Sequence, residues 1–157
     1  MTSAIEYWKS RVEAHHAQSI RAQNEASWPS GDFWSSLASS FKEDPHRTDD
    51  LVLNRLIQEI GPNTTILDVG GGAGRYSLPL ALRCGQVTVV DSSESMLAEL
   101  RYGASAANID NLRIVQGLWE VVDTEQTDLV LCAHVVYGVL GLKTHTKIAL
   151  VVRKEAD

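Results

Sequence analysis

The sequence predicts an α/β fold built on a doubly wound, mostly parallel sheet, and three features support this prediction. From residue 64 onward, short apolar segments alternate with segments of helical pattern. Four glycines crowd into residues 70–74, directly after the first apolar segment. Asp68 and Asp91 stand within or at the end of the first two apolar segments. Such alternation is typical of parallel sheets covered on both faces, which bind ligands beyond the carboxyl ends of their strands.

Residues 1–47 are predicted to form a helical N-terminal extension. One helical face is marked by side chains at spacings of three and four residues, namely Ile5, Trp8, Val12, His16 and Ile20. After a break at SWPSG, Asp32 is expected to cap a short second helix. The extension also holds most of the aromatic residues of the chain. These side chains predict either packing between helices or a lid over a bound acceptor.

Residues 48–157 are predicted to form the sheet domain. The domain begins with a helix that starts at Thr48–Asp50 and has Leu51 on its buried face. Five apolar segments are then expected as strands, at 64–69, 86–91, 111–117, 127–133 and 147–152. Helices are expected between the first three strands, and Ser92 or Ser93 can cap the second of these helices.

Charge and composition exclude several classes of function. The formal net charge of −6 argues against a general affinity for nucleic acid or anionic membranes, since both reward a basic surface. No apolar stretch approaches the roughly 18 residues of a membrane span, and the charged N-terminus is unlike a secretory signal, so a cytoplasmic protein is expected. Cys84 and Cys132 lack a CxxC spacing, which predicts buried thiols and no metal site.

The glycine segment fits only some of the known ligand-binding loops. A phosphate-binding P-loop needs a lysine after the glycines, in the pattern GxxxxGK[ST], and none follows here. A dinucleotide-binding pattern, GxGxxG or GxGxxA, is matched only loosely, because Ser77 takes the last position when the count starts at Gly72. An NAD(P)-dependent oxidoreductase therefore stays open as an alternative.

Asp68 favours a cationic ligand over a phosphate. Asp68 and Asp91 could instead each cap a turn or a helix. A carboxylate here repels a pyrophosphate on the loop, because two unit charges ~6 Å apart at an effective dielectric of ~20 interact by roughly 3 kcal/mol. S-adenosylmethionine fits, since it carries an ammonium, a sulfonium and a ribose but no phosphate. Asp91 ends the next strand, where a carboxylate can accept both ribose hydroxyls of a nicotinamide or an adenosylmethionine cofactor.

Four segments resemble, in order and spacing, the motifs of a class I (Rossmann-like) S-adenosylmethionine-dependent methyltransferase: DVGGGAG, VTVVDSSESML, NLRIVQGLWE and TDLVLCAHVVY. The resemblance runs from about Asp44 to Tyr137 and implies S-adenosylmethionine as cofactor and the strand order 3-2-1-4-5. It implies the following places around the cofactor: Asp68, Gly70, Gly72 and Gly74 at the methionine moiety, Asp91 at the ribose, and Ser92 and Met96 near the adenosine.

The third and fourth motifs supply the remaining site residues. Family members often place an aspartate at the adenine amino group, whereas Leu118 and Trp119 stand here. Their backbone atoms are expected to serve instead, and Trp119 either walls the purine or fills the core. His134 and Tyr137 follow the fourth strand, where the family contacts the methyl group and its acceptor. His134 has the chemistry of a general base, with a structural histidine as an equal alternative.

The resemblance implies methyl transfer, and two features favour a small-molecule acceptor over nucleic acid. These are the acidic charge and the absence of an [ND]PP[YF] segment. The family fold has seven strands, and strands six and seven are not expected within these residues, so the chain is expected to be truncated. An uncovered fifth strand favours a homodimer. A non-catalytic subunit that binds cofactor or a partner chain is the remaining alternative.

Overall fold

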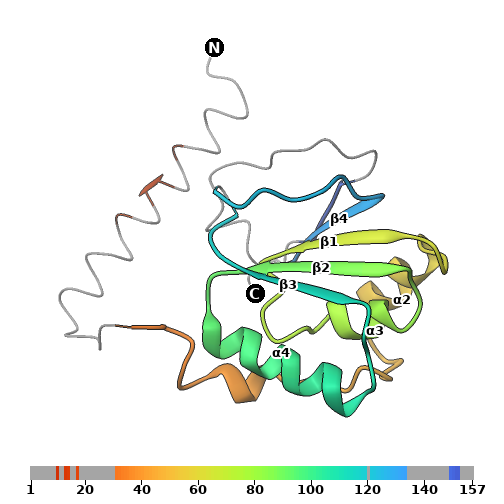
Figure 1. The fold of residues 1–157 in the computed structure, drawn as a ribbon, viewed down its shortest axis with the longest axis horizontal. Helices are drawn as coiled ribbons and strands as arrows, with labels where there is room; N and C mark the ends of the chain where they lie inside the picture. The colour runs from red at the N-terminus through yellow and green to blue at the C-terminus, as the bar shows by residue number, and fades with distance from the viewer. Residues whose placement is uncertain are drawn as a thin grey trace.

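The computed structural model describes residues 31–119, 121–133 and 149–152, together with four residues near the N-terminus: Ser10, Glu13, Ala14 and Ala17. Its centre is a five-stranded parallel sheet in the order β3-β2-β1-β4-β5 (Figure 1). This is the order that the resemblance implies. The strands are β1 (Thr65–Val69), β2 (Gln86–Asp91), β3 (Leu112–Gln116), β4 (Leu129–Ala133) and β5 (Ala149–Val152).

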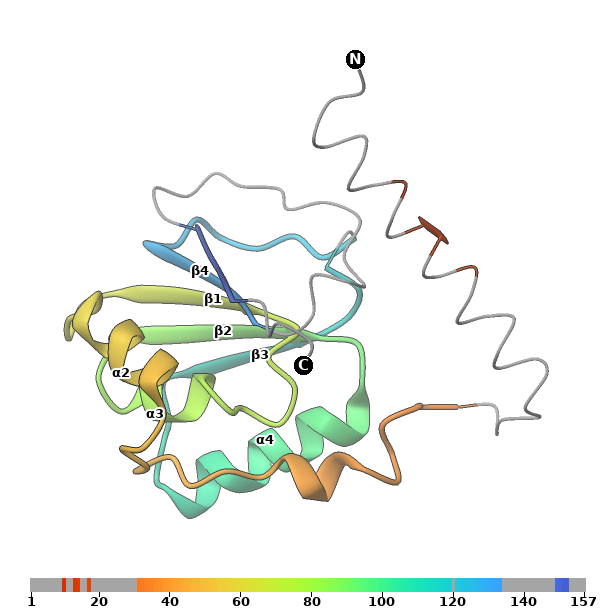
Figure 2. The same cartoon turned by 180° about the vertical axis from the view of Figure 1, so that it is seen from behind.

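The helices α2 (Leu51–Gln58), α3 (Ser77–Ala81) and α4 (Glu94–Ala106) lie on the same side of the sheet (Figures 1 and 2). Their apolar side chains form one core cluster with alternate residues of the strands, such as Val87 and Val89. The intervening residues, such as Val90, face the opposite side, because side chains alternate along a strand. Among the described residues, that second face is covered by Trp119 and Val122, from the segment after β3.

Side-chain caps fix where two of the helices begin. The Asp50 carboxylate accepts hydrogen bonds from the backbone N–H groups of Val52 and Leu53, both at 3.0 Å, and so starts α2. Leu51 was expected on the buried face of this helix, but it is 84% exposed, and Leu53 takes the buried position. The rest of the predicted face is buried as expected, with Leu56 in the core and Val52, Ile57 and Ile60 packed against it.

Ser93, rather than Ser92, caps α4, since its hydroxyl accepts a hydrogen bond from the backbone N–H of Met96 at 3.2 Å. This cap sets the orientation of the helix that follows β2. Because β2 ends at Asp91, the cap lies two residues from the carboxylate that the sequence predicts to bind ribose.

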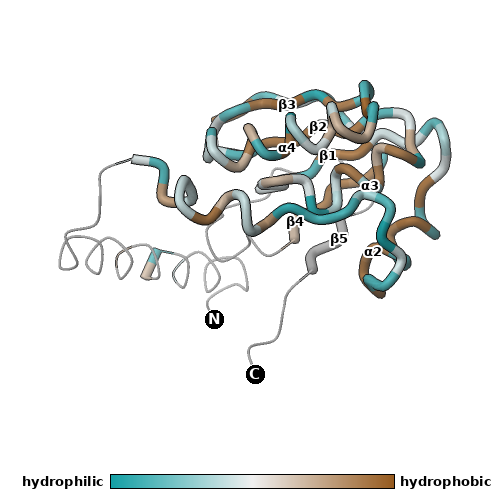
Figure 3. The backbone as a smooth tube through the Cα atoms, turned by 90° about the horizontal axis from the view of Figure 1, so that it is seen from below, coloured by the Kyte–Doolittle hydropathy of each residue, from teal (hydrophilic) through white to brown (hydrophobic). Residues whose placement is uncertain are grey.

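Residues 31–50 form a segment that runs along α4 and leads into α2 (Figure 2). The helix expected after Asp32 is only a short 3-10 helix, η1 (Ala38–Phe41). Within residues 31–50, the stretch from Lys42 to Asp50 is strongly hydrophilic, in contrast to the strands of the sheet (Figure 3). Lys42 anchors the segment to α4 through an ion pair with Glu99 at 2.8 Å.

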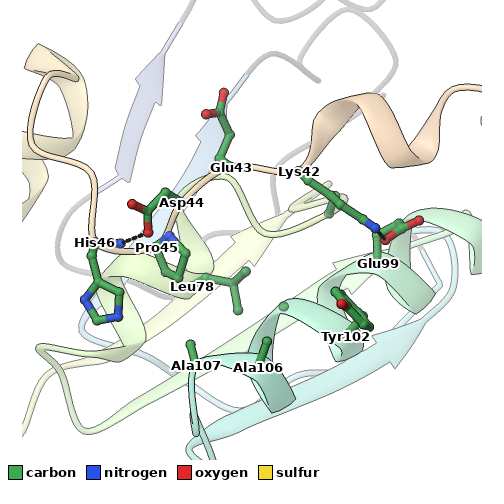
Figure 4. A pocket seen from close by; sticks show the side chains of 12 residues that line it. Lys42, Glu43, Asp44, Pro45, His46, Leu78, Glu99, Tyr102, Ala106 and Ala107 are labelled. Atoms are coloured by element: carbon green, nitrogen blue, oxygen red, sulfur yellow. Dashed lines mark hydrogen bonds and ion pairs between the residues drawn. The ribbon is translucent and has the colours of Figure 1, made fainter.

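A cavity of about 310 Å³ lies between this segment and α4 (Figure 4). Its apolar walls include Pro45, Leu78 and Ala106, and the ion pair between Lys42 and Glu99 stands at its rim. The segment therefore leaves a gap over α4 beside the contact between Lys42 and Glu99.

No helix in the described part of the chain is both long and apolar enough to cross a membrane. Cys84 and Cys132 are buried free thiols. Burial raises the pKa of each thiol, so both are un-ionised at neutral pH.

Gly74 provides a test of how α3 and α4 pack behind the glycine loop. It has a φ of +90°, and an added Cβ would lie 2.5 Å from Leu100 Cδ1 and 2.8 Å from Leu78 Cγ. Gly74→Ala is expected to lower the free energy of unfolding by about 2–4 kcal/mol, from backbone strain and overpacking together. Urea denaturation measures this loss.

Gly31→Ala is the matched control, because Gly31 also has a positive φ, +143°, but an added Cβ there meets nothing within 4 Å. Its loss is expected to be about 1–2 kcal/mol, from strain alone. Equal losses for the two variants would contradict the packing role of Gly74.

Candidate functional site

The loops that follow β1, β2 and β3 meet at the carboxyl edge of the sheet, and Asp91 joins them. Its carboxylate Oδ2 accepts a hydrogen bond from the backbone N–H of Gly72 at 2.9 Å. Its backbone carbonyl accepts one from Gly117 N–H at 2.9 Å, and Val90 O accepts one from Gly70 N–H at 2.7 Å. One end of β2 therefore fixes both neighbouring loops.

The loop needs glycines for two reasons, namely backbone dihedral angles with positive φ and a lack of space for a Cβ atom. Gly70 and Gly72 have positive φ values of 68° and 54°. A Cβ on Gly72 would lie 3.0 Å from Met96 Cε. A Cβ on Gly71 would lie 2.8 Å from Asp68 Oδ2. The loop backbone therefore lies directly against two predicted cofactor residues, Asp68 and Met96.

Asp68 is a buried acid, only 3% exposed, beneath the glycine loop. Its carboxylate accepts a hydrogen bond from the Ser77 hydroxyl. Burial raises the pKa of Asp68 to about 7; the charge of Asp91 acts in the same direction and the bond from Ser77 in the opposite one. A nearby cation would lower the pKa of this buried carboxyl group and so favour its ionised form at neutral pH.

Asp91 keeps hydrogen-bonding capacity after its protein contacts are made. Oδ1 accepts the backbone N–H of Ser93 at 2.8 Å and Oδ2 accepts that of Gly72. Each carboxylate oxygen has a second lone pair, so the group can still accept from two hydroxyls. Burial raises the pKa of Asp91, against the lowering effect of these two N–H groups. Ser92 is exposed beside it.

The residues predicted around the adenosine separate into two groups. Met96 is buried against the glycine loop, packed with Ala73 and Ala38. Leu118 is 59% exposed, whereas Trp119 is 7% exposed and packs beneath the sheet with Leu67 and other core residues. The Trp119 ring thus occupies the core, which was the alternative to a purine wall.

His134 and Tyr137, the predicted catalytic residues, lie outside the described residues. The structure also identifies residues that the sequence did not assign. Ser77 bonds to Asp68, and Ser93 bonds to Asp91. Ser93 was recognisable as a helix cap, but nothing in the spacing linked Ser77 to Asp68. No group of three or more His, Cys, Asp or Glu side chains placed to hold a metal is found in the described part of the chain.

These groups suit a ligand with a cationic end and a pair of hydroxyls. Asp68 and Asp91 belong to adjacent strands, with Asp68 in register with Val89 two residues before Asp91. The glycine loop approaches both, since a Cβ on Gly71 would lie 2.8 Å from Asp68 Oδ2 and the Gly72 N–H donates to Asp91 Oδ2 at 2.9 Å. A phosphate group at this place would meet two acids, whereas an amine and a ribose would be bound by them.

Comparison with known proteins identifies the type of domain. A family model described as a methyltransferase domain matches residues 66–153. The ribosomal RNA small subunit methyltransferase G of Neisseria gonorrhoeae is 38% identical over 69 residues, which cover 42% of this chain and 33% of that protein. The chain thus spans about a third of the length of this curated relative.

Two further similarities differ in extent. The solved structure of the CcbJ methyltransferase from Streptomyces caelestis superposes with a TM-score of 0.53 at 28% sequence identity, covering 68% of this chain and 44% of that one. A segment of 24 residues is 88% identical to the polyphosphate kinase of Parasynechococcus marenigrum, 3% of that protein. A segment of 24 residues is far shorter than a domain and carries no kinase function to this chain.

The expectation that nucleic acid is excluded as a partner was wrong. Curated relatives are ribosomal RNA methyltransferases by name, and they overturn it. The physical reason is that net charge is a sum over the chain, whereas nucleic-acid binding depends on the local distribution of charge. A value of −6 for 157 residues therefore says little about a particular surface.

Asp68 yields a pH prediction for the protein without ligand. Its folded-state pKa is about 7, against 3.8 for an ordinary aspartate. The stability that the protonated group contributes is therefore complete below about pH 4 and is lost as the pH rises through 7. Asp68→Asn removes this loss, so the variant is expected to gain stability relative to wild type between pH 4 and 8, by up to about 4 kcal/mol.

Urea denaturation of both proteins across this pH range measures the difference. Ser92→Ala is the control, because that side chain is exposed and its variant should follow the wild-type profile. Parallel profiles for Asp68→Asn and wild type would contradict the raised pKa.

Proposed function

Because this chain belongs to the methyltransferase-domain family, whose members use S-adenosylmethionine, we propose that it binds that cofactor at the carboxyl edge of β1 and β2 and methylates RNA. One observation carries the proposed cofactor site. A buried acid, Asp68, lies against the glycine loop, and the same loop is hydrogen-bonded to a second acid, Asp91.

Each part of the site has a role in binding. Asp68 faces the cationic end of the cofactor, and its raised pKa is returned toward the ordinary value by that charge. Asp91 accepts the ribose hydroxyls with the lone pairs that Gly72 and Ser93 leave available. Met96, whose methyl group lies against Gly72, and the exposed Leu118 are the proposed contacts to the adenosine. Gly72 cannot carry a side chain without moving Met96.

The cofactor supplies a methyl group already activated by a positively charged sulfur. The chain's own residues then need to bind and orient, since correct placement of a nucleophile supplies much of the rate. A general base is required only for an acceptor that is protonated at neutral pH. His134 and Tyr137, which follow β4, are the proposed contacts to the acceptor.

RNA as acceptor is supported by the curated relatives that methylate ribosomal RNA by name. The described surface itself offers little free positive charge. Lys42, Arg101 and Arg113 are each paired with a glutamate, at 2.8, 2.8 and 3.0 Å respectively. To contact RNA phosphates, these basic side chains would have to leave their glutamate partners, or the contacts would come from other parts of the protein. RNA binding is expected to weaken strongly with added salt.

Calorimetry with S-adenosylhomocysteine tests the cofactor site. Asp91→Ala is expected to weaken binding at least tenfold, because hydrogen bonds to a charged group are worth about 1.5–3 kcal/mol. Gly72→Val is expected to abolish binding, because the side chain enters the space of Met96. Ser105→Ala, an exposed residue near the other end of α4, should bind within about twofold of wild type. Absence of binding by the folded wild-type chain would refute the proposed function.

Transfer of a labelled methyl group tests the acceptor and separates catalysis from mere cofactor binding. Incorporation into small-subunit ribosomal RNA is expected, and it should vanish in Asp91→Ala. Label found only in low-molecular-weight metabolites would contradict an RNA acceptor. Cofactor binding with no transfer to either would indicate a non-catalytic subunit.

A further inference from the structure

We propose that Asp32 is a positioning residue of the cofactor site, and that it holds the ribose-binding carboxylate Asp91 in place through Ser93. This inference rests on the proposed function, because it concerns the affinity of the same cofactor. It makes residues 31–38 part of the site, although they lie far from the glycine loop in the sequence.

Asp32 is bound to the start of α4 by several hydrogen bonds. The Ser93 hydroxyl lies 2.8 Å from Asp32 Oδ2, and the Ser95 hydroxyl lies 2.6 Å from the same atom. The backbone N–H of Ser95 also donates to Oδ2, at 2.8 Å. Trp34 N–H donates to Oδ1 at 3.1 Å and holds the local turn. The carboxylate thereby ties residues 31–34 to a helix that starts some 60 residues later.

Ser93 connects this contact to Asp91. Its backbone N–H donates to Asp91 Oδ1 at 2.8 Å, while its hydroxyl donates to Asp32. The same hydroxyl accepts the backbone N–H of Met96 at 3.2 Å. The other Asp91 oxygen binds Gly72 N–H. Asp32 is therefore one end of a continuous series of hydrogen bonds that passes through the predicted ribose carboxylate to the glycine loop.

A second contact joins the same segment to the site from the apolar side. Trp34 packs against a small core cluster formed by Ala38, Ala73 and Met96. Ala73 belongs to the glycine loop, and the Met96 methyl group lies against Gly72. Residues 32–38 thus contact both elements that would enclose the ribose and adenosine.

Asp32 is a charged group close to Asp91. Partial burial raises its pKa, but the hydrogen bonds from Ser95 and Ser93 outweigh this and lower it to about 2, so the group is ionised at any working pH. Its charge is repulsive to Asp91, whose pKa it raises further. The proposed role of Asp32 is to orient Ser93 and Asp91 through hydrogen bonds, at 2.8 Å from the Ser93 hydroxyl to Asp32 and 2.8 Å from the Ser93 N–H to Asp91.

The test compares binding of S-adenosylhomocysteine and its 2′-deoxy analogue by calorimetry, in wild type and in Asp32→Ala. Asp32→Ala is expected to weaken binding of S-adenosylhomocysteine by about tenfold. The preference for the ribose ligand over the deoxy analogue is expected to shrink from about tenfold to about twofold, because a displaced Asp91 no longer uses the 2′-hydroxyl.

Asp44→Ala is the matched control, since Asp44 lies in the same segment and its carboxylate accepts the N–H of His46 at 2.8 Å, within its own turn. It should keep the wild-type preference. If Asp32→Ala loses affinity for both ligands equally, the residue has only a structural role and the inference is refuted. Unchanged binding of both ligands would also refute it, while leaving the proposed function intact. No binding by wild type would instead remove the proposed function itself.

Ser95→Ala keeps the test decisive if Asp32→Ala fails to fold. It removes one hydroxyl donor to Asp32 and leaves the caps of Ser93 in place. It is expected to reduce the preference for the ribose ligand in the same direction, by about twofold to threefold. Full wild-type preference in a folded Ser95→Ala protein would count against Asp32 as a positioning residue.

Discussion

The interaction on which the site depends is the hydrogen bond from the Gly72 N–H to the Asp91 carboxylate. It joins the loop after β1 to the end of β2, and the Asp91 carbonyl joins the loop after β3 to the same point. Parallel strands bring their carboxyl ends to one edge of the sheet, but they do not by themselves fix the loops there. Asp91 does this, and it still keeps lone pairs free for a ligand.

Asp68 illustrates a conflict between stability and function. A buried carboxylate with a pKa near 7 weakens the folded state at neutral pH, and Ser77 offsets only part of that cost. The same feature suits the site to a cationic ligand, because the ligand restores a favourable partner to the acid. The glycine at position 71 is part of this arrangement, since a side chain there would collide with the carboxylate. The buried carboxylate of Asp68 and the glycine at position 71 therefore depend on each other.

The acidic charge of the chain was a poor guide to its partners. Lys42, Arg101 and Arg113 are each engaged with a glutamate on the described surface, so their charge is locally neutralised rather than absent. Relatives that methylate ribosomal RNA show that a domain of this family is compatible with nucleic acid. The proposed cofactor site, by contrast, is built on two specific acids, Asp68 and Asp91, and their spacing is visible in the sequence.

The sequence by itself determined the alternation of strands and helices, the place of the glycine loop and the positions of Asp68 and Asp91 in adjacent strands, because these depend on local pattern and on short spacings, while the strand order followed from the family resemblance. Only the tertiary structure decided that Trp119 fills the core and that Asp32 accepts hydrogen bonds from Ser93 and Ser95 at the start of α4. It also decided that Ser77 meets Asp68. Such contacts depend on how helices pack onto the sheet, and a hydroxyl or a carboxylate in the sequence does not specify which distant partner that packing will supply.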